Sequence, residues 1–320
     1  MTVSQGAQPR GGLGRLVLAA AAFGLFAPAP LFALPLAALL IASRPETRAE
    51  RVTAVLAGGI SLWWLLVPGE LPEQVVRATA VLSTAAFAAA SLATRASFIH
   101  RALLALGVAA VGVGALFLAH DWSWGALHWW VQYRTGYATR FALAQLRAAS
   151  GGPGTAGYGA LGDQFDAWLN RSVAFVADNF PALVALQVLG GLAIATAWYH
   201  RLASRPRGLG LQPLPEFRFT EHLGWAAAIP LVILLLPRLA RWKLVATNLL
   251  LLVGTLYALR GVAVAAFGAL LAGGGPLTIA LAILAAVFML PVVAGGAILL
   301  GVLDAGLDLR GRWRKPPARD

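Results

Sequence analysis

The stretch LVATNLLLLVGTLYALRGVAVAAFGALLA, residues Leu244–Ala272, decides the fold class. Apart from Arg260 it contains no charged residue. About 20 apolar residues are enough for a helix to cross the hydrocarbon core of a bilayer, which is roughly 30 Å thick. A helix that is apolar on every side belongs either to the core of a large protein or to a membrane. We therefore expect this stretch to span a membrane.

The composition extends this expectation to the rest of the chain. Of 320 residues, 59% are hydrophobic and 12% are charged, and the charged share is about half that of a soluble domain. The other long apolar runs are Leu16–Ala42, Val52–Val67, Val75–Ala93, Ala102–Ala119, Ala182–Tyr199, Leu223–Leu236 and Leu277–Leu303. We predict an all-α, polytopic transmembrane helical bundle of about eight spans, with seven and nine as the alternatives.

A segment of different character separates the first four spans from the last four. Residues 1–119 hold the N-terminal membrane helices and residues 182–309 the C-terminal ones, while residues 310–320 form a basic tail. The insert between spans four and five, residues 120–181, is richer in charge and contains the Gly/Pro-rich stretch 150–162. Aromatic residues on both sides of that stretch predict two amphipathic helices, on the membrane surface or capping the bundle, joined by a mobile loop. On the C-terminal side the residues at helical spacing are Leu161, Phe165, Trp168, Leu169 and Phe175 or Val176.

Prolines interrupt the first apolar run. Pro28, Pro30 and Pro35 each lack a backbone N–H and clash with the preceding helical turn, so we predict a break or a re-entrant start. A cleaved signal peptide ending near Ala29 is the alternative. The hydrophobicity continues to Ala42, which favours an uncleaved first span.

The chain is strongly basic, with 25 Lys and Arg residues against 13 Asp and Glu and a net charge of +12. The cations lie in short segments between apolar runs, which argues against nucleic-acid binding and favours contact with membrane lipid. Cations near both ends predict cytoplasmic N- and C-termini in a bacterial inner membrane, by the positive-inside rule. Two arginine clusters would then face outward, in conflict with that rule: 44, 48 and 51, and 201, 205, 207 and 218.

The sequence contains no catalytic or cofactor motif. Without cysteine it can form no disulfide, thiolate nucleophile or iron–sulfur ligand. Gly152–Gly157 matches a dinucleotide-binding pattern only formally, since it contains proline and follows no strand. His120, Asp121 and His128 come nearest to a metal cluster, but a helix would hold the two histidines about 12 Å apart. We therefore expect no enzymatic activity, no metal and no cofactor.

Ionisable groups inside apolar runs are the usual sign of function in a membrane protein. Arg260 is the cation deepest in a run, and Asp304 lies at the end of the last run. If the last two runs fold as a hairpin about Gly273–Pro276, residues at the same level have numbers that add to about 549. Arg260 and Asp304 then stand about 22 Å apart along the axis. We therefore expect no direct pair, and expect Asn248 close to Asp304 instead.

Each of these two residues has two interpretations. Arg260 contacts an anion or substrate in a cavity, or it reaches an interface or unwound carbonyls beside Gly261. Asp304 contributes to a binding site, or it pairs with Arg310 or Arg312 near the helix end. A binding site of this kind would be covered by the aromatic segment His120–Trp130. The candidate solute-binding residues are Asn248, Arg260, Asp304, Trp129 and Trp130.

Three stretches of the C-terminal half resemble a known family. They are LPEFRFTEHLGW (Leu214–Trp225), NLLLLVGTLYALRGVAV (Asn248–Val264) and LLGVLDAGLDLR (Leu299–Arg310). An Asn-led span with an aromatic-x-x-polar-Gly step, followed by a Gly-x-x-Asp ending before an arginine, resembles the closing helices of the YybS-like family of predicted bacterial membrane proteins. Arg260 departs from that family, whose members often carry an uncharged polar residue before the glycine.

The resemblance implies a function, because that family is similar in arrangement to the substrate-binding membrane subunits of energy-coupling-factor importers. It implies that a small solute binds within the bundle, and that a separate transmembrane coupling protein and ATPase subunits supply the energy. A polar cavity at Asn248 or Arg260 would favour this function.

We expect a small-solute-binding or transport subunit first, and the residues leave two other functions open. One is a non-catalytic membrane scaffold or assembly factor that holds partners through the insert and the basic tail. It predicts a solid bundle with an exposed apolar patch on the insert. The other is an intramembrane enzyme acting on lipid, for which only Asp304 and Asp308 are candidates.

Overall fold

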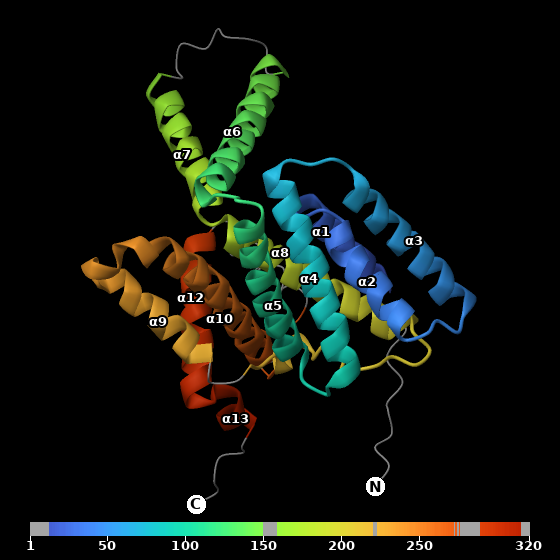
Figure 1. Ribbon diagram of the computed structural model, residues 1–320. Coiled ribbons are helices and arrows are strands. Elements are labelled where there is room, and N and C mark those ends of the chain that lie inside the picture. The colour runs from blue at the N-terminus through green and yellow to red at the C-terminus, as the bar shows by residue number, and fades with distance from the viewer. Residues whose placement is uncertain are drawn as a thin grey trace, which may run out of the picture. The chain divides into compact units, whose positions relative to one another are not determined.

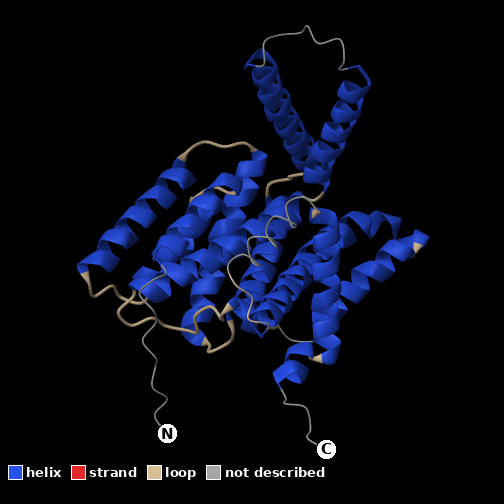
Figure 2. Ribbon diagram, turned by 180° about the vertical axis from the view of Figure 1, so that it is seen from behind, coloured by secondary structure: helices blue, strands red, loops and turns tan. Residues whose placement is uncertain are grey.

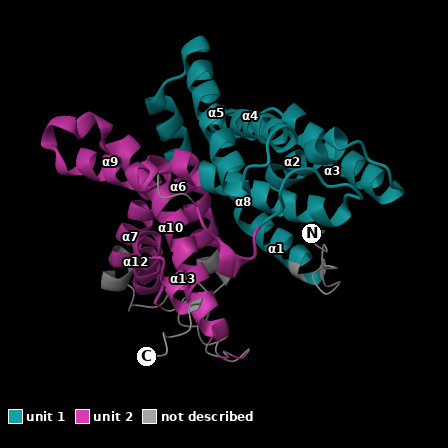
Figure 3. Cartoon of the chain, turned by 90° about the horizontal axis from the view of Figure 1, so that it is seen from below, with its two compact units in different colours: residues 1–133, 184–211 teal, residues 134–183, 212–320 magenta. Residues whose placement is uncertain are grey.

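The computed structural model describes residues 13–149, 159–219, 223–271, 273, 275 and 289–314. These residues form helices and loops and contain no strand (Figures 1 and 2). The prediction of an all-α fold is therefore confirmed. The chain divides into two compact units, coloured separately in Figure 3. The first comprises residues 1–133 and 184–211, and the second residues 134–183 and 212–320.

Five helical segments among the described residues are long and apolar enough to cross a membrane. They are α4 (Leu71–Ala93), α5 (Phe98–Ala119), α8 (Phe180–Leu202), the 3-10 helix η3 (Pro237–Trp242) together with α10 (Lys243–Leu271), and α12 (Leu290–Leu307). Three shorter apolar helices accompany them: α1 (Leu13–Phe26), α2 (Pro30–Ala42) and α9 (Leu223–Leu235). These helices fit an integral membrane protein, whereas the count of about eight spans stays a prediction.

The first apolar run is broken at Pro28 and Pro30, as predicted, but not at Pro35, which lies inside α2. Helix α1 ends at Phe26, and α2 begins with Pro30, whose missing N–H costs nothing in the first helical turn. The carbonyl of Phe26, left without a helical partner, accepts a hydrogen bond from Gln187 Nε2 at 2.8 Å. Gln187 belongs to α8, so a side chain of the same unit stabilises the break between α1 and α2.

Helix α3 (Arg48–Leu66) corresponds to the second predicted span, but it is not one of the five long apolar segments. It starts with a capping box, in which Glu50 N–H donates to Thr47 Oγ1 and the Glu50 carboxylate accepts from Thr47 N–H, both at 3.2 Å. The same carboxylate accepts from the backbone N–H groups of Glu46 and Ser204, each at 2.6 Å. Glu50 thus ties the start of α3 to the segment after α8.

Small residues let helices pack closely in the first unit, α4 against α5 and α8 against α2. Ala102, Ala105 and Ala109 of α5 are fully buried, as is Phe87 of α4. Gly191 of α8 lies directly against the carbonyl of Leu31, where any larger residue would collide with backbone. Small side chains at helix contacts are typical of membrane bundles, where close backbone approach replaces the hydrophobic driving force.

In the second unit α10 packs against α12 and α9. A Cβ atom on Gly261 would overlap the carbonyl of Ala297, and one on Gly301 would overlap the carbonyl of Tyr257. The two glycines therefore bring the backbones of α10 and α12 into direct contact. Both pairs have residue numbers that add to 558, and this sum defines the register of the two antiparallel helices.

The insert forms two helices, α6 (Trp124–Ala149) and α7 (Gly159–Asp178). We expected a loop over residues 150–162, of which residues 150–158 lie outside the described residues. The expectation is wrong for residues 159–162, because α7 begins at Gly159. Leu169 and Val173 form the buried side of α7, with Val173 facing Gly136 of α6. Of the basic tail, α13 (Leu309–Arg314) is described and residues 315–320 are not.

The glycine contacts between α10 and α12 predict position-specific effects of alanine. We expect Gly261→Ala and Gly301→Ala each to lower the free energy of unfolding by about 1–3 kcal/mol, because backbone must move to admit the methyl group. Gly254 lies on the same helix with no atom within 4 Å of the added Cβ. Gly254→Ala should therefore stabilise the protein by up to about 1 kcal/mol through helix propensity. Denaturant unfolding in detergent measures all three, and equal effects at Gly254 and Gly261 would contradict the tight contact.

The hydrogen bonds to Glu50 predict an acid-dependent step in stability. The Ser204 N–H, followed by those of Thr47 and Glu46, lowers the pKa of Glu50 from its ordinary 4.5 to about 2, against the opposing effect of burial. Because the folded-state pKa is the lower one, the stabilisation is complete above pH 4.5 and is lost as the pH falls towards about 2. In thermal unfolding, Glu50→Gln should be less stable than wild type at pH 7, with the difference shrinking across that window.

The control for this prediction is Glu70→Gln, at an exposed position where the side chain makes no cap hydrogen bond. Glu70→Gln should show the wild-type acid dependence. A difference between wild type and Glu50→Gln that stays constant from pH 7 to pH 2 would refute the role of the Glu50 carboxylate.

Candidate functional site

Asp304 lies at the centre of a buried ionic cluster in the second unit. Its side chain is fully buried, and Oδ2 accepts hydrogen bonds from Arg260 Nε at 2.9 Å and Arg310 Nη2 at 2.7 Å. Both arginine side chains are also buried. The expectation of no direct pair between Arg260 and Asp304 is therefore wrong, and of the contacts left open for Asp304 the structure shows the one with Arg310.

Backbone carbonyls take up further guanidinium donors of the cluster. Arg260 Nη2 donates to the Asp304 carbonyl at 3.0 Å and Nη1 to the Phe219 carbonyl at 3.4 Å. Arg310 Nη1 donates to the Pro215 carbonyl at 2.8 Å, and Nε to Asp304 Oδ1 at 3.3 Å. The cluster thereby joins α10, α12 and α13 to the loop that contains the 3-10 helix η2 (Leu214–Glu216).

An aromatic face completes the surroundings of Arg260. The Phe219 ring lies 5.1 Å from the Arg260 guanidinium carbon, within the range of a cation–π interaction. The same ring makes an edge contact with Tyr257, at 5.1 Å between centroids. Arg260 is therefore held by a carboxylate, two carbonyls and a ring, all from its own chain.

The failed expectation about Arg260 and Asp304 traces to the register of α10 and α12. At the observed sum of 558, Arg260 lies level with Ile298, only about 9 Å along the axis from Asp304. Helical side chains lean towards the N-terminus of their own helix. Because the helices are antiparallel, the two side chains lean towards each other and close that gap.

The charges of the cluster leave a net +1 in an apolar interior. Removing ions from water costs several kcal/mol each, and this is offset only when every partner is well placed. Here one carboxylate faces two guanidiniums, and carbonyl dipoles meet further donors. Arginine remains protonated and offers no acceptor. The arrangement is therefore better suited to holding the helices together than to transferring a proton.

Asn248 lies apart from this cluster. Its Nδ2 donates to the carbonyls of Asp178 at 2.8 Å and Leu244 at 2.9 Å, and its Oδ1 accepts from Ala182 N–H at 2.9 Å. The expected proximity of Asn248 and Asp304 is therefore wrong. Asn248 instead fastens the start of α10 to the joint between α7 and α8.

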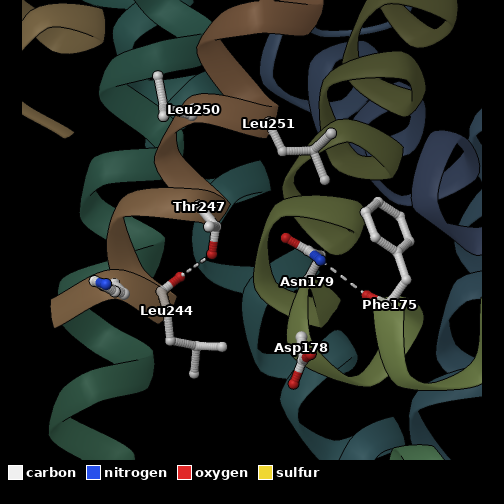
Figure 4. Close-up of a pocket in the computed structure, with 8 residues that line it drawn as sticks. Phe175, Asp178, Asn179, Leu244, Thr247, Leu250 and Leu251 are labelled. Atoms are coloured by element: carbon white, nitrogen blue, oxygen red, sulfur yellow. Dashed lines mark hydrogen bonds between the residues drawn. The ribbon is translucent and has the colours of Figure 1, made fainter. Parts of the chain in front are cut away.

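An open depression of about 590 Å³ adjoins this joint (Figure 4). We call it the α7–α10 groove. Its lining residues are Phe175, Asp178, Asn179, Lys243, Leu244, Thr247, Leu250 and Leu251. None of the five candidate solute-binding residues is among them, although Asn248 holds its two walls together.

No family model, no curated protein and no solved structure matches this chain. The resemblance to the YybS-like family stays a prediction from the three C-terminal stretches.

Trp129 and Trp130 belong to the first unit. The Trp129 ring is stacked on that of Tyr133 at 5.3 Å between centroids, and meets Trp130 edge-on at 5.1 Å. Trp129 is exposed, as expected for a residue available to a partner, a lipid or a ligand. Their role as a lid stays a prediction.

Sequence reasoning missed one buried cation, Arg101 of α5, which is 2% exposed. Its guanidinium donates to Ser91 Oγ at 2.8 Å and to the Leu209 carbonyl, and lies over the Phe87 ring. Its Nε has no hydrogen-bond partner in the described part of the chain. The predicted span begins at Ala102, directly after this arginine, so hydropathy placed Arg101 at a boundary and concealed its burial.

The described residues contain no group of three or more His, Asp or Glu side chains that could hold a metal ion. His120 instead packs on Trp122, at 5.3 Å between ring centroids.

The buried cluster predicts a large effect of removing its one acid. Asp304→Ala should lower the free energy of unfolding by about 3–5 kcal/mol, because two buried guanidiniums lose their counter-charge. Asp308→Asn is the control: Asp308 pairs with Arg218 at 3.0 Å but both side chains are exposed, so its loss should cost less than about 1 kcal/mol. Asparagine also accepts the left-handed backbone of position 308, where φ is 45°.

Denaturant unfolding in one detergent compares the two variants. Similar losses for Asp304→Ala and Asp308→Asn would show that the buried cluster does not hold the second unit together.

Proposed function

We propose that this integral membrane protein is a non-catalytic scaffold or assembly factor that holds a partner protein through α6 and α7. The observation that carries the proposal is a set of exposed aromatic side chains, called the aromatic surface here: Tyr137 with Phe141 on α6, and Phe165 with Trp168 on α7. These side chains are between 42% and 65% exposed. Large exposed apolar patches commonly mark sites of protein or membrane interaction.

The helices that carry the aromatic surface differ in composition from the long apolar helices. Neither α6 nor α7 is one of the long apolar segments, and both carry exposed charges such as Arg140 and Arg171 among their aromatic residues. Tyr137 stacks on Phe141 at 6.4 Å, and Phe165 lies 5.7 Å from Trp168. Exposed aromatic side chains beside arginine are the residue types that contribute most to protein interfaces.

The polar residues of the interior support the same proposal. A solute-binding subunit needs polar groups that are directed at its ligand. Arg260 and Asp304 bind each other, and Asn248 binds backbone at the α7–α8 joint. All three therefore have structural partners within the chain.

A second candidate function is the solute-binding or transport subunit implied by the family resemblance. The α7–α10 groove is the observation that favours it, because it offers an open, largely apolar site with polar groups among its lining residues. This function would require a transmembrane coupling protein and ATPase subunits as partners.

Quantitative affinity capture from cross-linked bacterial membranes separates the two candidates. The bait is the tagged full-length chain, compared with the double variant Phe141→Ser/Trp168→Ser. We expect the variant to recover its partner about tenfold less well or worse, since each central aromatic residue of an interface contributes on the order of 1–2 kcal/mol. Trp225→Ser is the control, because Trp225 is even more exposed but lies on the apolar helix α9.

Three results would decide the question. Loss of a membrane or envelope protein in the double variant alone supports the scaffold. Recovery of a coupling protein with ATPases, in equal amounts from wild type and variant, supports the transport subunit instead. Equal losses in the double variant and in Trp225→Ser would overturn the role of the aromatic surface.

A further inference from the structure

Hydrogen bonds of Asn248 join the two walls of the α7–α10 groove. Asn248 joins the last residue of α7, Asp178, to the third residue of α8, Ala182, by hydrogen bonds of 2.8 and 2.9 Å. Asn179, which is 7% exposed, donates from Nδ2 to the Phe175 carbonyl at 2.9 Å. The half-buried amide of Asn248 thus joins the two walls, and that of Asn179 caps the end of α7, so the groove is a preformed site.

Polar and apolar residues both line the groove. Its polar residues are Lys243, Thr247, Asp178 and Asn179, of which Thr247 and Asn179 lie midway along it in Figure 4. Figure 4 shows Leu250 and Leu251 at the opposite end from Asp178 and Leu244. From Lys243 to Leu251 the helix rises about 12 Å, which is the length of most of one lipid acyl chain.

The groove itself is lined by one cation, Lys243, and one acid, Asp178, and the chain beside it is basic. The short segment that leads into α10 contains Arg238, Arg241 and Lys243, all exposed, and no acid. Trp242 is also exposed, with the Arg241 guanidinium 6.0 Å from its ring. A basic cluster with tryptophan at the start of a spanning helix is typical of the headgroup level of a membrane, where anionic lipids are attracted.

We propose that the α7–α10 groove is a binding site for an anionic phospholipid. The phosphate lies at the ammonium of Lys243, and one acyl chain follows Leu244, Leu250 and Leu251 past the Phe175 ring. Charge favours an anionic over a zwitterionic lipid, because Lys243 together with Arg238 and Arg241 beside the groove outnumbers the one acid, Asp178. The leucines decide against a free phosphate, which would gain nothing from them. The site shares no residue with the aromatic surface and does not depend on the scaffold function.

The test uses the full-length protein in mild detergent, with bound lipid counted by native mass spectrometry during titration. The probes are phosphatidylglycerol, phosphatidylcholine and inorganic phosphate. We expect phosphatidylglycerol to bind most tightly, and Lys243→Gln to weaken its binding about fivefold, the contribution of one cation at a membrane surface. Lys243→Arg should retain wild-type binding, which separates loss of charge from loss of structure.

The matched control is Arg312→Gln, an exposed cation of the same unit on α13, which should leave binding unchanged. Any of three results would overturn the proposal. If phosphatidylcholine binds as tightly as phosphatidylglycerol, the groove is only an apolar surface. If inorganic phosphate binds as tightly as phosphatidylglycerol, the groove is only an anion site. Equal weakening by Arg312→Gln and Lys243→Gln would show a diffuse effect of net charge.

Discussion

The second unit depends on one carboxylate that two buried arginines share. Asp304 brings α12 to Arg260 of α10 and to Arg310 of α13, and the same arginines reach the carbonyls of Phe219 and Pro215. In an apolar interior such charges are tolerated only when they neutralise one another and their donors are satisfied. The requirement is strict, and it makes the positions of three helices and one loop interdependent. An ionic centre of this kind specifies a single arrangement of helices that apolar side chains alone specify poorly.

The ionic centre itself depends on a close backbone contact. The Cα atoms of Gly261 and Gly301 each lie against a backbone carbonyl of the other helix. This contact determines the register of α10 and α12, and the register brings Arg260 within reach of Asp304. A shift of one helical turn, about 5.4 Å, would separate the two charges and leave Arg260 unpaired, while Asp304 would keep Arg310. Packing of small residues and pairing of charges therefore select the same register. Each would be less specific alone, because leucine and alanine surround both.

The level of detail that sequence could predict follows from the range of the interactions involved. Local chemistry predicted the break between α1 and α2, since Pro28 and Pro30 act within one turn, and it predicted the amphipathic helices of the insert. The Arg260–Asp304 pair was missed because its geometry depends on the stagger of two helices, which the position of the connecting turn alone does not give. Asn248 was placed near Asp304 by the same error. Arg101 was missed because hydropathy ends a span at the first charge, whereas the folded chain covers that arginine with Ser91 and Leu209.

The polar residues within the C-terminal helices hold the structure, and the proposed interactions with other molecules fall on exposed surfaces: aromatic side chains on α6 and α7, and the α7–α10 groove. The direct test is a double-mutant cycle of Arg260→Met and Asp304→Leu, with the free energy of unfolding measured for wild type, both single variants and the double variant. The account predicts a coupling energy of about 2–3 kcal/mol, with the double variant more stable than the sum of the single losses implies. Additive losses, within about 0.5 kcal/mol, would contradict it.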